Sequence, residues 1–216
     1  MPPSPRLFAA LAACSLVPWL LGAALGGRFV ALETRAGSAL RLDLAGLVDG
    51  AELAFEGRVL ATNVELDLHG RPCTRATLLV SRAFQGDGVG AVDVRLPGGV
   101  LPSGDGLLIP GMPSLVAGEE VVLFLSRESG AGLRVPVGLA QGKFRLVRDA
   151  AGGRTLVRDG ADLALLDARS GELSHADAQA SYDYAAFVAE VLAAVGARRG
   201  APGGVPPPRA PGSERR

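Results

Sequence analysis

Apolar and polar side chains alternate along the middle of this chain, and the alternation restricts its possible folds more than any other feature. In residues 52–61, the apolar residues Phe55 and Val59 occupy odd-numbered positions. The charged residues, including Glu56, occupy even-numbered positions. A repeat of two is typical of a strand with one buried face. Gly57 interrupts the run, which predicts a bend or bulge there.

The same alternation returns in later segments that turn residues separate. They span residues 74–84, 92–96, 121–125, 133–137 and 144–156. The first of them most simply pairs with residues 52–61 as an antiparallel hairpin. Residues 121–125 are apolar at every position, which predicts a strand buried on both faces. Gly152 and Gly153 predict a tight turn inside the last segment.

Two stretches have helical spacing instead. Asp43 is placed to cap a short helix over residues 44–50. Near the C-terminus, apolar residues recur at intervals of three and four over residues 184–195, which predicts an amphipathic helix. We expect Ser181 to be its N-cap and Gly196 its C-terminal cap.

These elements predict the fold class. About seven short strands without a long helix between them indicate an all-β fold. We expect an antiparallel barrel or sandwich, with the short N-terminal helix and the amphipathic C-terminal helix packed on it. This single β-rich domain covers residues 41–197.

The two ends of the chain differ from this domain. Residues 7–25 form an apolar run behind Arg6 and end in small residues, which predicts a secretory signal peptide over residues 1–26. An uncleaved anchor is the competing interpretation, because a spanning helix needs ~20 apolar residues. Pro18 disfavours such a helix. Residues 198–216 are rich in Pro, Gly and Arg and are predicted to be disordered.

Export predicts a periplasmic or extracellular location, with membrane attachment only if the leader is uncleaved. Cys14 lies in the leader, within a Leu-Ala-Ala-Cys sequence that resembles a lipidation motif. Lipidation there would leave an exposed apolar N-terminus, so we interpret Cys14 as part of the leader. Cleavage leaves Cys73 as the only thiol, which excludes an intramolecular disulfide. We expect Cys73 to be buried and inert, and a reactive thiol is the alternative.

Composition argues against several function classes. The 22 basic and 22 acidic residues cancel, so electrostatics favours neither nucleic acid nor an anionic membrane surface as a partner. The chain has only two histidines, His69 and His175. His69 and Cys73 are too few ligands for zinc, which takes three or four from protein. We expect no metal and no cofactor.

The longest irregular segment, residues 100–118, is rich in Gly, Pro, Ser and Asp. Long loops within a compact domain tend to be functional. We predict a ligand- or partner-binding surface here that includes Asp105, Leu107 and Ile109. The alternative is a structural connection that packs Ile109 and Leu115 on one end of the sheet.

A second candidate for this surface is the segment that contains Gln141 and Lys143. It combines an amide, a glycine, the only lysine of the chain and an aromatic residue, Phe144. A hairpin turn that returns Phe144 to the core is the simpler interpretation of this segment.

Catalytic motifs are missing from the sequence. One hydrolase hypothesis uses Ser103 or Asp105 with His69 as the base, but Ser103 does not lie in a G-x-S-x-G motif. Glu119 and Glu120 are neighbours on a predicted strand, so their side chains point to opposite faces and cannot share one site. We therefore predict no catalytic residues.

Several segments resemble a group of uncharacterised exported bacterial proteins that has no assigned activity. They are residues 51–59, 94–99, 110–113, 118–125 and 138–144. The layout also resembles the OB-type barrel of netrin and metalloproteinase-inhibitor domains, which implies an OB-like barrel with a coiled first strand. The chain lacks the N-terminal cysteine and the disulfides of those inhibitors, so the resemblance does not imply inhibition.

Together these features predict an exported binding or interaction module of the cell envelope without catalytic activity. Its partner would be an envelope or extracellular protein or ligand. Two alternatives stay open: a hydrolase that uses His69, and a membrane-tethered accessory protein if the leader is retained.

Overall fold

The computed structural model describes residues 38–159, 163–167, 170–175 and 179–200. The predicted leader, including Cys14, and the tail beyond residue 200 lie outside the described residues. Within the described part of the chain, no helix has the length and apolar character that a membrane crossing requires.

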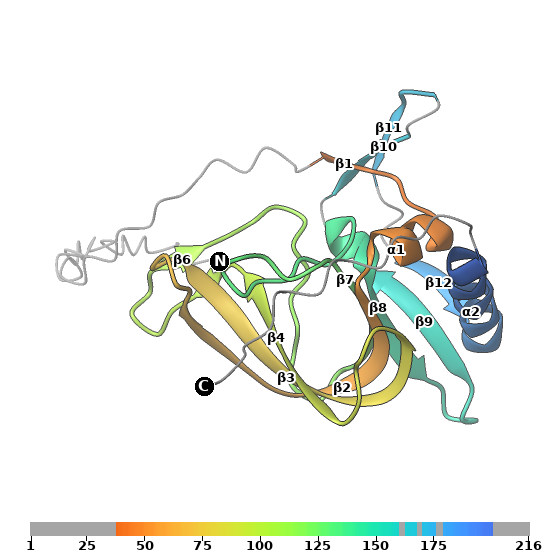
Figure 1. Ribbon diagram of the computed structural model, residues 1–216, viewed down its shortest axis with the longest axis horizontal. Coiled ribbons are helices and arrows are strands. Elements are labelled where there is room, and N and C mark those ends of the chain that lie inside the picture. Colours follow the sequence, from red (N-terminus) through yellow and green to blue (C-terminus); the bar gives the residue numbers. More distant parts are fainter. Residues whose placement is uncertain (1–37, 160–162, 168–169, 176–178, 201–216) are drawn as a thin grey trace, which may run out of the picture.

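A seven-stranded antiparallel sheet dominates the structure, in the order β12-β9-β8-β7-β2-β3-β4. Its strands are β2 (Leu53–Leu66), β3 (Pro72–Gln85), β4 (Ala91–Pro97), β7 (Glu120–Leu125), β8 (Lys143–Arg148), β9 (Arg154–Asp159) and β12 (Gln179–Asp183). The sheet curls strongly along its long hairpin β2–β3 (Figure 1). The predicted β-rich antiparallel fold class is confirmed.

Two smaller sheets complete the β-structure. One contains β1 (Ser38–Leu40), β10 (Ala164–Leu166) and β11 (Leu173–His175), and it projects from the helical end of the molecule (Figure 1). The other is a hairpin of two-residue strands, β5 (Gly99–Val100) and β6 (Gly106–Leu107). This hairpin lies within the segment that was predicted to be irregular.

The large sheet carries a hydrophobic cluster on each face. On one face β7, β8 and β9 pack under the two helices, with Phe124, Phe144 and Phe187 in edge-to-face contact. On the other face Phe55, Leu78 and their neighbours fill the inside of the curl. Strand β7 contributes to both clusters, so the predicted two-faced burial of residues 121–125 is confirmed.

The predicted bend at Gly57 is also present. The pairing of β2 with β3 shifts register between Glu56 and Gly57. A Cβ atom at Gly57 would lie 2.8 Å from the carbonyl oxygen of Leu79. The glycine therefore permits a close approach of the two strands where the sheet curls.

Residues 133–137 were predicted to form a strand, and that prediction is wrong. They make only an isolated bridge between Pro136 and Leu125, together with backbone hydrogen bonds from Ser126 to Val135 and from Val137 to Phe124. The N–H of Arg134, nearby in this segment, donates instead to the carbonyl oxygen of Arg95 in β4, so the pairing beside β7 stops after one bridge. The alternation at these positions reflects packing beside β7 rather than a strand of its own.

The short helix α1 (Leu44–Gly50) agrees with the prediction. The Oδ1 atom of Asp43 accepts a hydrogen bond of 2.8 Å from the backbone N–H of Gly46, as expected for an N-cap. Leu44, Leu47 and Val48 are its buried residues.

Helix α2 (Tyr184–Gly200) differs from the prediction at both ends. Ser181 lies in β12, and Asp183 caps the helix by accepting a 2.9 Å hydrogen bond from the N–H of Ala186. Gly196 does not end the helix. The additional turn places Arg198 beside the end of α1, where its Nη1 donates to the carbonyl oxygens of Val48 (2.6 Å) and Ala51 (2.9 Å). A tertiary contact thus accompanies the longer helix.

Glu56 was predicted to lie on the solvent side of its strand, and this is also wrong. Glu56 is only 7 % exposed, and its Oε2 accepts a 2.7 Å hydrogen bond from the Tyr184 hydroxyl. The guanidinium of Arg154 lies 3.7 Å from the centre of the Tyr184 ring. Helix α2 covers this face of β2, so both faces of the strand are buried here.

We expect Tyr184→Phe to lower the free energy of unfolding by about 1–3 kcal/mol at neutral pH, because the buried Glu56 loses its donor. Burial, and then the Glu56 contact, raise the pKa of Tyr184 above its ordinary value. The hydroxyl contribution is therefore present below about pH 10 and is lost as the pH rises through the folded-state pKa. Urea unfolding from about pH 8 to about pH 11 should show that the difference in free energy of unfolding between wild type and Tyr184→Phe decreases. A difference that stays constant over this pH range would contradict the prediction.

Candidate functional site

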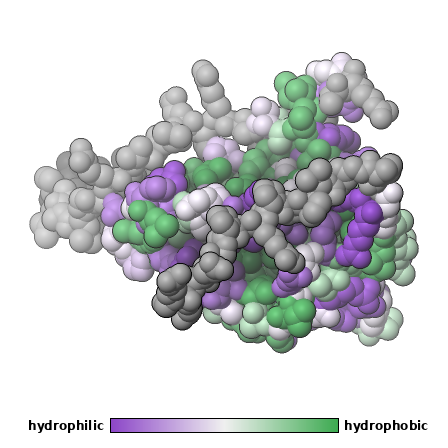
Figure 2. Space-filling model, viewed as in Figure 1, coloured by the Kyte–Doolittle hydropathy of each residue, from purple (hydrophilic) through white to green (hydrophobic). Residues whose placement is uncertain are grey.

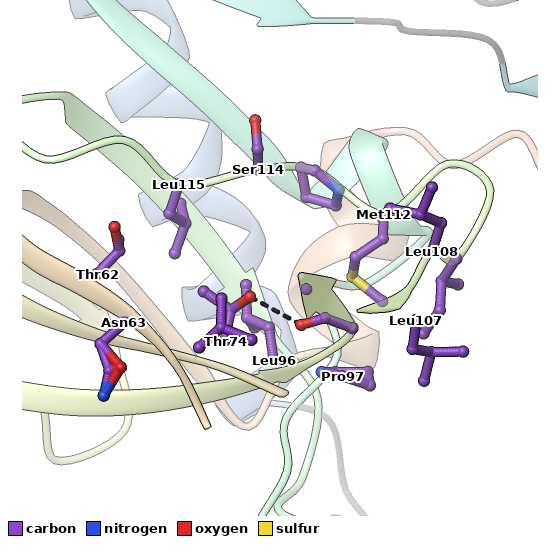
Figure 3. Close-up of a pocket in the computed structure, with 15 residues that line it drawn as sticks. Thr62, Asn63, Thr74, Leu96, Pro97, Leu107, Leu108, Met112, Ser114 and Leu115 are labelled. Carbon is purple, nitrogen blue, oxygen red and sulfur yellow. Dashed lines mark hydrogen bonds between the residues drawn. The ribbon is translucent and has the colours of Figure 1, made fainter. Parts of the chain in front are cut away.

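A cavity of about 390 Å³ lies where the ends of β2, β3 and β4 meet the segment after β6 (Figure 3). Thr62 and Asn63 of β2 lie on one side of it, and Leu108 and Met112 on the other (Figure 3). The remaining lining residues are Val64, Thr74, Leu96, Pro97, Gly98, Gly99, Leu107, Ile109, Pro113, Ser114 and Leu115.

Two glycines allow the chain to turn at the cavity wall. Gly98 and Gly99 have φ angles of 96° and 138°, a conformation that favours glycine. A Cβ atom at Gly99 would lie 2.8 Å from a methyl carbon of Val64. The hydroxyl of Thr74 fixes the turn by donating a 2.8 Å hydrogen bond to the carbonyl oxygen of Gly98 (Figure 3).

The described lining is mostly apolar and contains no titratable side chain. Its side-chain polar groups belong to Thr62, Asn63, Thr74 and Ser114. Such a surface can hold a neutral molecule or an apolar group and can donate or accept a few hydrogen bonds. Acid–base or nucleophilic chemistry needs an ionisable partner, which this lining does not supply.

Exposed apolar side chains surround this end of the molecule. Figure 2 shows a hydrophobic patch at the end that carries β6. Large apolar side chains exposed in the turns and strands here include Leu66, Leu68, Val100 and Leu108, and Leu68 is 80 % exposed. Contiguous exposed apolar surface is a feature of ligand and partner sites.

The structure places the predicted residues of the long segment in different settings. Leu107 and Ile109 line the cavity. Asp105 is exposed in the turn between β5 and β6, and its Oδ2 accepts a 3.0 Å hydrogen bond from the hydroxyl of Ser103. Asp105 is not one of the lining residues.

Gln141 lies away from this cavity, in a 3-10 helix (Leu139–Gly142) where a hairpin turn was predicted. Its side chain is buried, with 1 % exposure, and links this helix to the N-terminal strand. The amide nitrogen donates to the carbonyl oxygen of Leu40 at 2.8 Å, and the amide oxygen accepts from the N–H of Leu42 at 2.9 Å. No local sequence pattern predicts this contact, because its partners lie far apart in the chain.

Lys143 is also buried, with 4 % exposure, and its charge is fully engaged. Its Nζ lies 2.8 and 2.9 Å from the two carboxylate oxygens of Glu119 and donates to the carbonyl oxygen of Ser114 at 2.7 Å. The ammonium therefore holds the segment that ends the cavity wall against β8. Phe144 enters the core, as predicted.

The three residues of the hydrolase hypothesis do not form a hydrogen-bonded set. The described hydrogen bond of the Ser103 hydroxyl runs to Asp105 rather than to an imidazole. His69 lies in the turn between β2 and β3, where its backbone N–H donates to Asp67. Glu119 and Glu120 pair with different cations, Lys143 and Arg148.

Metal and thiol chemistry receive no support from the described residues. They contain no group of three or more His, Cys, Asp and Glu side chains that could hold a metal ion. Cys73 is fully buried, and burial together with the Glu65 and Asp67 charges raises the pKa of its thiol.

Several cavity residues were not singled out from the sequence. The alternation predicted a first strand over residues 52–61, whereas β2 continues to Leu66. Thr62, Asn63 and Thr74 reach the cavity because two long strands pair along their whole length. No local motif carries that information.

No family model, no characterised protein and no solved structure matches this chain. The resemblance to an exported OB-like group stays a prediction.

We expect Lys143→Met to lower the free energy of unfolding by about 3–5 kcal/mol, because it leaves the Glu119 carboxylate without its cation in a buried setting. The double variant Lys143→Met/Glu119→Gln removes both charges and should recover most of that loss. Denaturant unfolding of wild type and the variants forms the test. A double variant less stable than Lys143→Met would contradict the expected coupling.

Cys73 should react with a thiol reagent such as 5,5′-dithiobis(2-nitrobenzoate) only when the protein unfolds, because it is buried and its thiolate is disfavoured. The measurement uses a Cys14→Ser chain, so that the signal comes from Cys73 alone. Rapid stoichiometric reaction under native conditions would contradict this expectation.

Proposed function

We propose that this protein is an exported, non-catalytic binding module that holds a neutral apolar ligand group in the cavity at the β6 end of its sheet. The observation that carries the proposal is the cavity itself, with a volume of about 390 Å³ and a described lining without titratable groups. Export is supported by the leader-like pattern of residues 1–26.

The size and lining of the cavity are suitable for a small molecule or a side chain of a larger partner. Ligand sites in proteins usually occupy about 300–1,000 Å³ and combine apolar walls with a few polar groups. Here Ile109, Met112 and Leu115 supply apolar wall, and the hydroxyls of Thr62 and Ser114 supply hydrogen-bonding groups. The ligand we expect is uncharged at the end that enters.

A rigid wall and an irregular wall face each other across this site. The wall from β2, β3 and β4 is a paired sheet, whereas residues 107–115 run opposite to it mostly without secondary structure. Lys143 anchors the far end of that irregular wall through the carbonyl oxygen of Ser114. This arrangement favours a site that is largely preformed.

Thr62→Trp should block the cavity, because Thr62 is an exposed residue at its wall and an indole ring would occupy the opening. We expect the variant to bind the neutral fluorescent probe N-phenyl-1-naphthylamine at least tenfold more weakly than wild type, a change of about 1.4 kcal/mol. Titration of the probe measures this.

The matched control is Thr155→Trp, because Thr155 is also an exposed strand threonine but does not line this cavity. It should bind the probe like wild type. Equal weakening in both variants, or unchanged binding by Thr62→Trp, would refute the proposal.

A further inference from the structure

A second cavity, of about 320 Å³, lies on the helical side of the molecule. Residues from the start of α1, from β9, β10 and β12, and from α2 line it. They are Arg41, Leu42, Asp43, Leu44, Arg158, Leu165, Ala180, Tyr182 and Glu190. It shares no lining residue with the apolar cavity at the β6 end.

Arg158 is the unusual residue of this cavity. Its guanidinium carbon lies 4.8 Å from the ring centre of Phe144 and 5.6 Å from that of Tyr182. Its Nε is buried and has no hydrogen-bond partner among the residues that the structure describes. Among the described residues, no carboxylate forms an ion pair with it and no acceptor forms a hydrogen bond with it.

A second cation, Arg41, lines the same cavity. Burial lowers the pKa of Arg158, Tyr182 opposes this shift, and the charge of Arg41 makes a smaller lowering contribution. A bound anion would be attracted to the Arg158 guanidinium and would offset its repulsion from Arg41. Arginine also presents a planar fork of donors that fits a carboxylate with two parallel hydrogen bonds.

A partly buried cation without a partner carries a desolvation cost that aromatic faces offset only in part. Lys143, a buried cation of the same sheet, is held by a carboxylate and a carbonyl oxygen. Arg158 lacks both kinds of partner within the described chain. The difference suggests that a ligand supplies the missing acceptor.

We propose that this second cavity binds a small organic monocarboxylate, with the carboxylate on Arg158 and the apolar part of the ligand against Leu42, Leu44 and Leu165 of the wall.

The rest of the lining favours a single negative charge. Asp43 and Glu190 line the cavity too, so a ligand with two or three charges meets repulsion. One oxygen of Asp43 is already used by the N–H of Gly46. Inorganic sulfate would also leave the apolar wall uncovered.

The experiment uses phenylacetate as the probe, with 2-phenylethanol as its neutral counterpart and sulfate as the inorganic anion. Calorimetric titration is done on wild type, Arg158→Met, Arg158→Lys and the control Arg58→Met, since Arg58 is exposed on β2 and lines neither cavity. We expect wild type and Arg58→Met to bind phenylacetate at least tenfold more tightly than either Arg158 variant. Both should also prefer phenylacetate to 2-phenylethanol and sulfate.

Thermal unfolding supplies a second readout. If the unpaired guanidinium serves a ligand, Arg158→Met without ligand should melt at or above the temperature of wild type. Phenylacetate should raise the melting temperature of wild type but not that of Arg158→Met. Arg158→Lys keeps a cation and replaces Arg158→Met as the test variant should Arg158→Met fold poorly.

Three results would overturn the proposal. They are no binding of phenylacetate to wild type at about 10 mM, equal binding by Arg158→Met, and equal binding of sulfate. Thr62→Trp, which changes only the apolar cavity, should leave phenylacetate binding unchanged, so the two proposals fail separately.

Discussion

Burial of β7 on both faces is the constraint on which the rest of the structure depends. Val122 and Phe124 point to the cluster under the helices, while Leu123 and Leu125 point into the curl of the sheet. Full burial of such a side chain contributes about 1.5–3 kcal/mol, so one short strand joins two hydrophobic clusters. Because β7 is central, α2 can cover one face while β3 and β4 curl over the other.

Buried polar groups attach the irregular segments to this sheet. Lys143 holds the end of the apolar cavity wall, Gln141 holds the N-terminal strand, and Glu56 holds α2 through Tyr184. Each of these groups carries a desolvation cost that only its partners offset. The main effect of these buried polar contacts is therefore to specify the position of each segment, and their net contribution to stability is smaller.

The two cavities differ in the physical property that a ligand would meet. The cavity at the β6 end has a described lining of apolar and hydroxyl or amide groups, so shape and apolar contact would select a ligand there. The cavity beside α1 and α2 contains the Arg158 guanidinium, close to the rings of Phe144 and Tyr182, so charge would select a ligand there. Lys143 and Gln141, which the sequence offered as binding residues, have internal partners instead.

The sequence by itself determined the β-rich class, the hairpin of β2 and β3, the bend at Gly57 and the cap at Asp43, because each follows from a local pattern. The tertiary structure alone decided that residues 133–137 are not a strand, that Glu56 is buried, and that α2 continues past Gly196. It also decided which distant residues share a cavity, as Thr62 and Met112 do. Alternation of apolar and polar residues predicts a strand from neighbouring positions alone. Burial and hydrogen-bond partners depend on which elements pack against each face of that strand. Those elements come from distant parts of the chain.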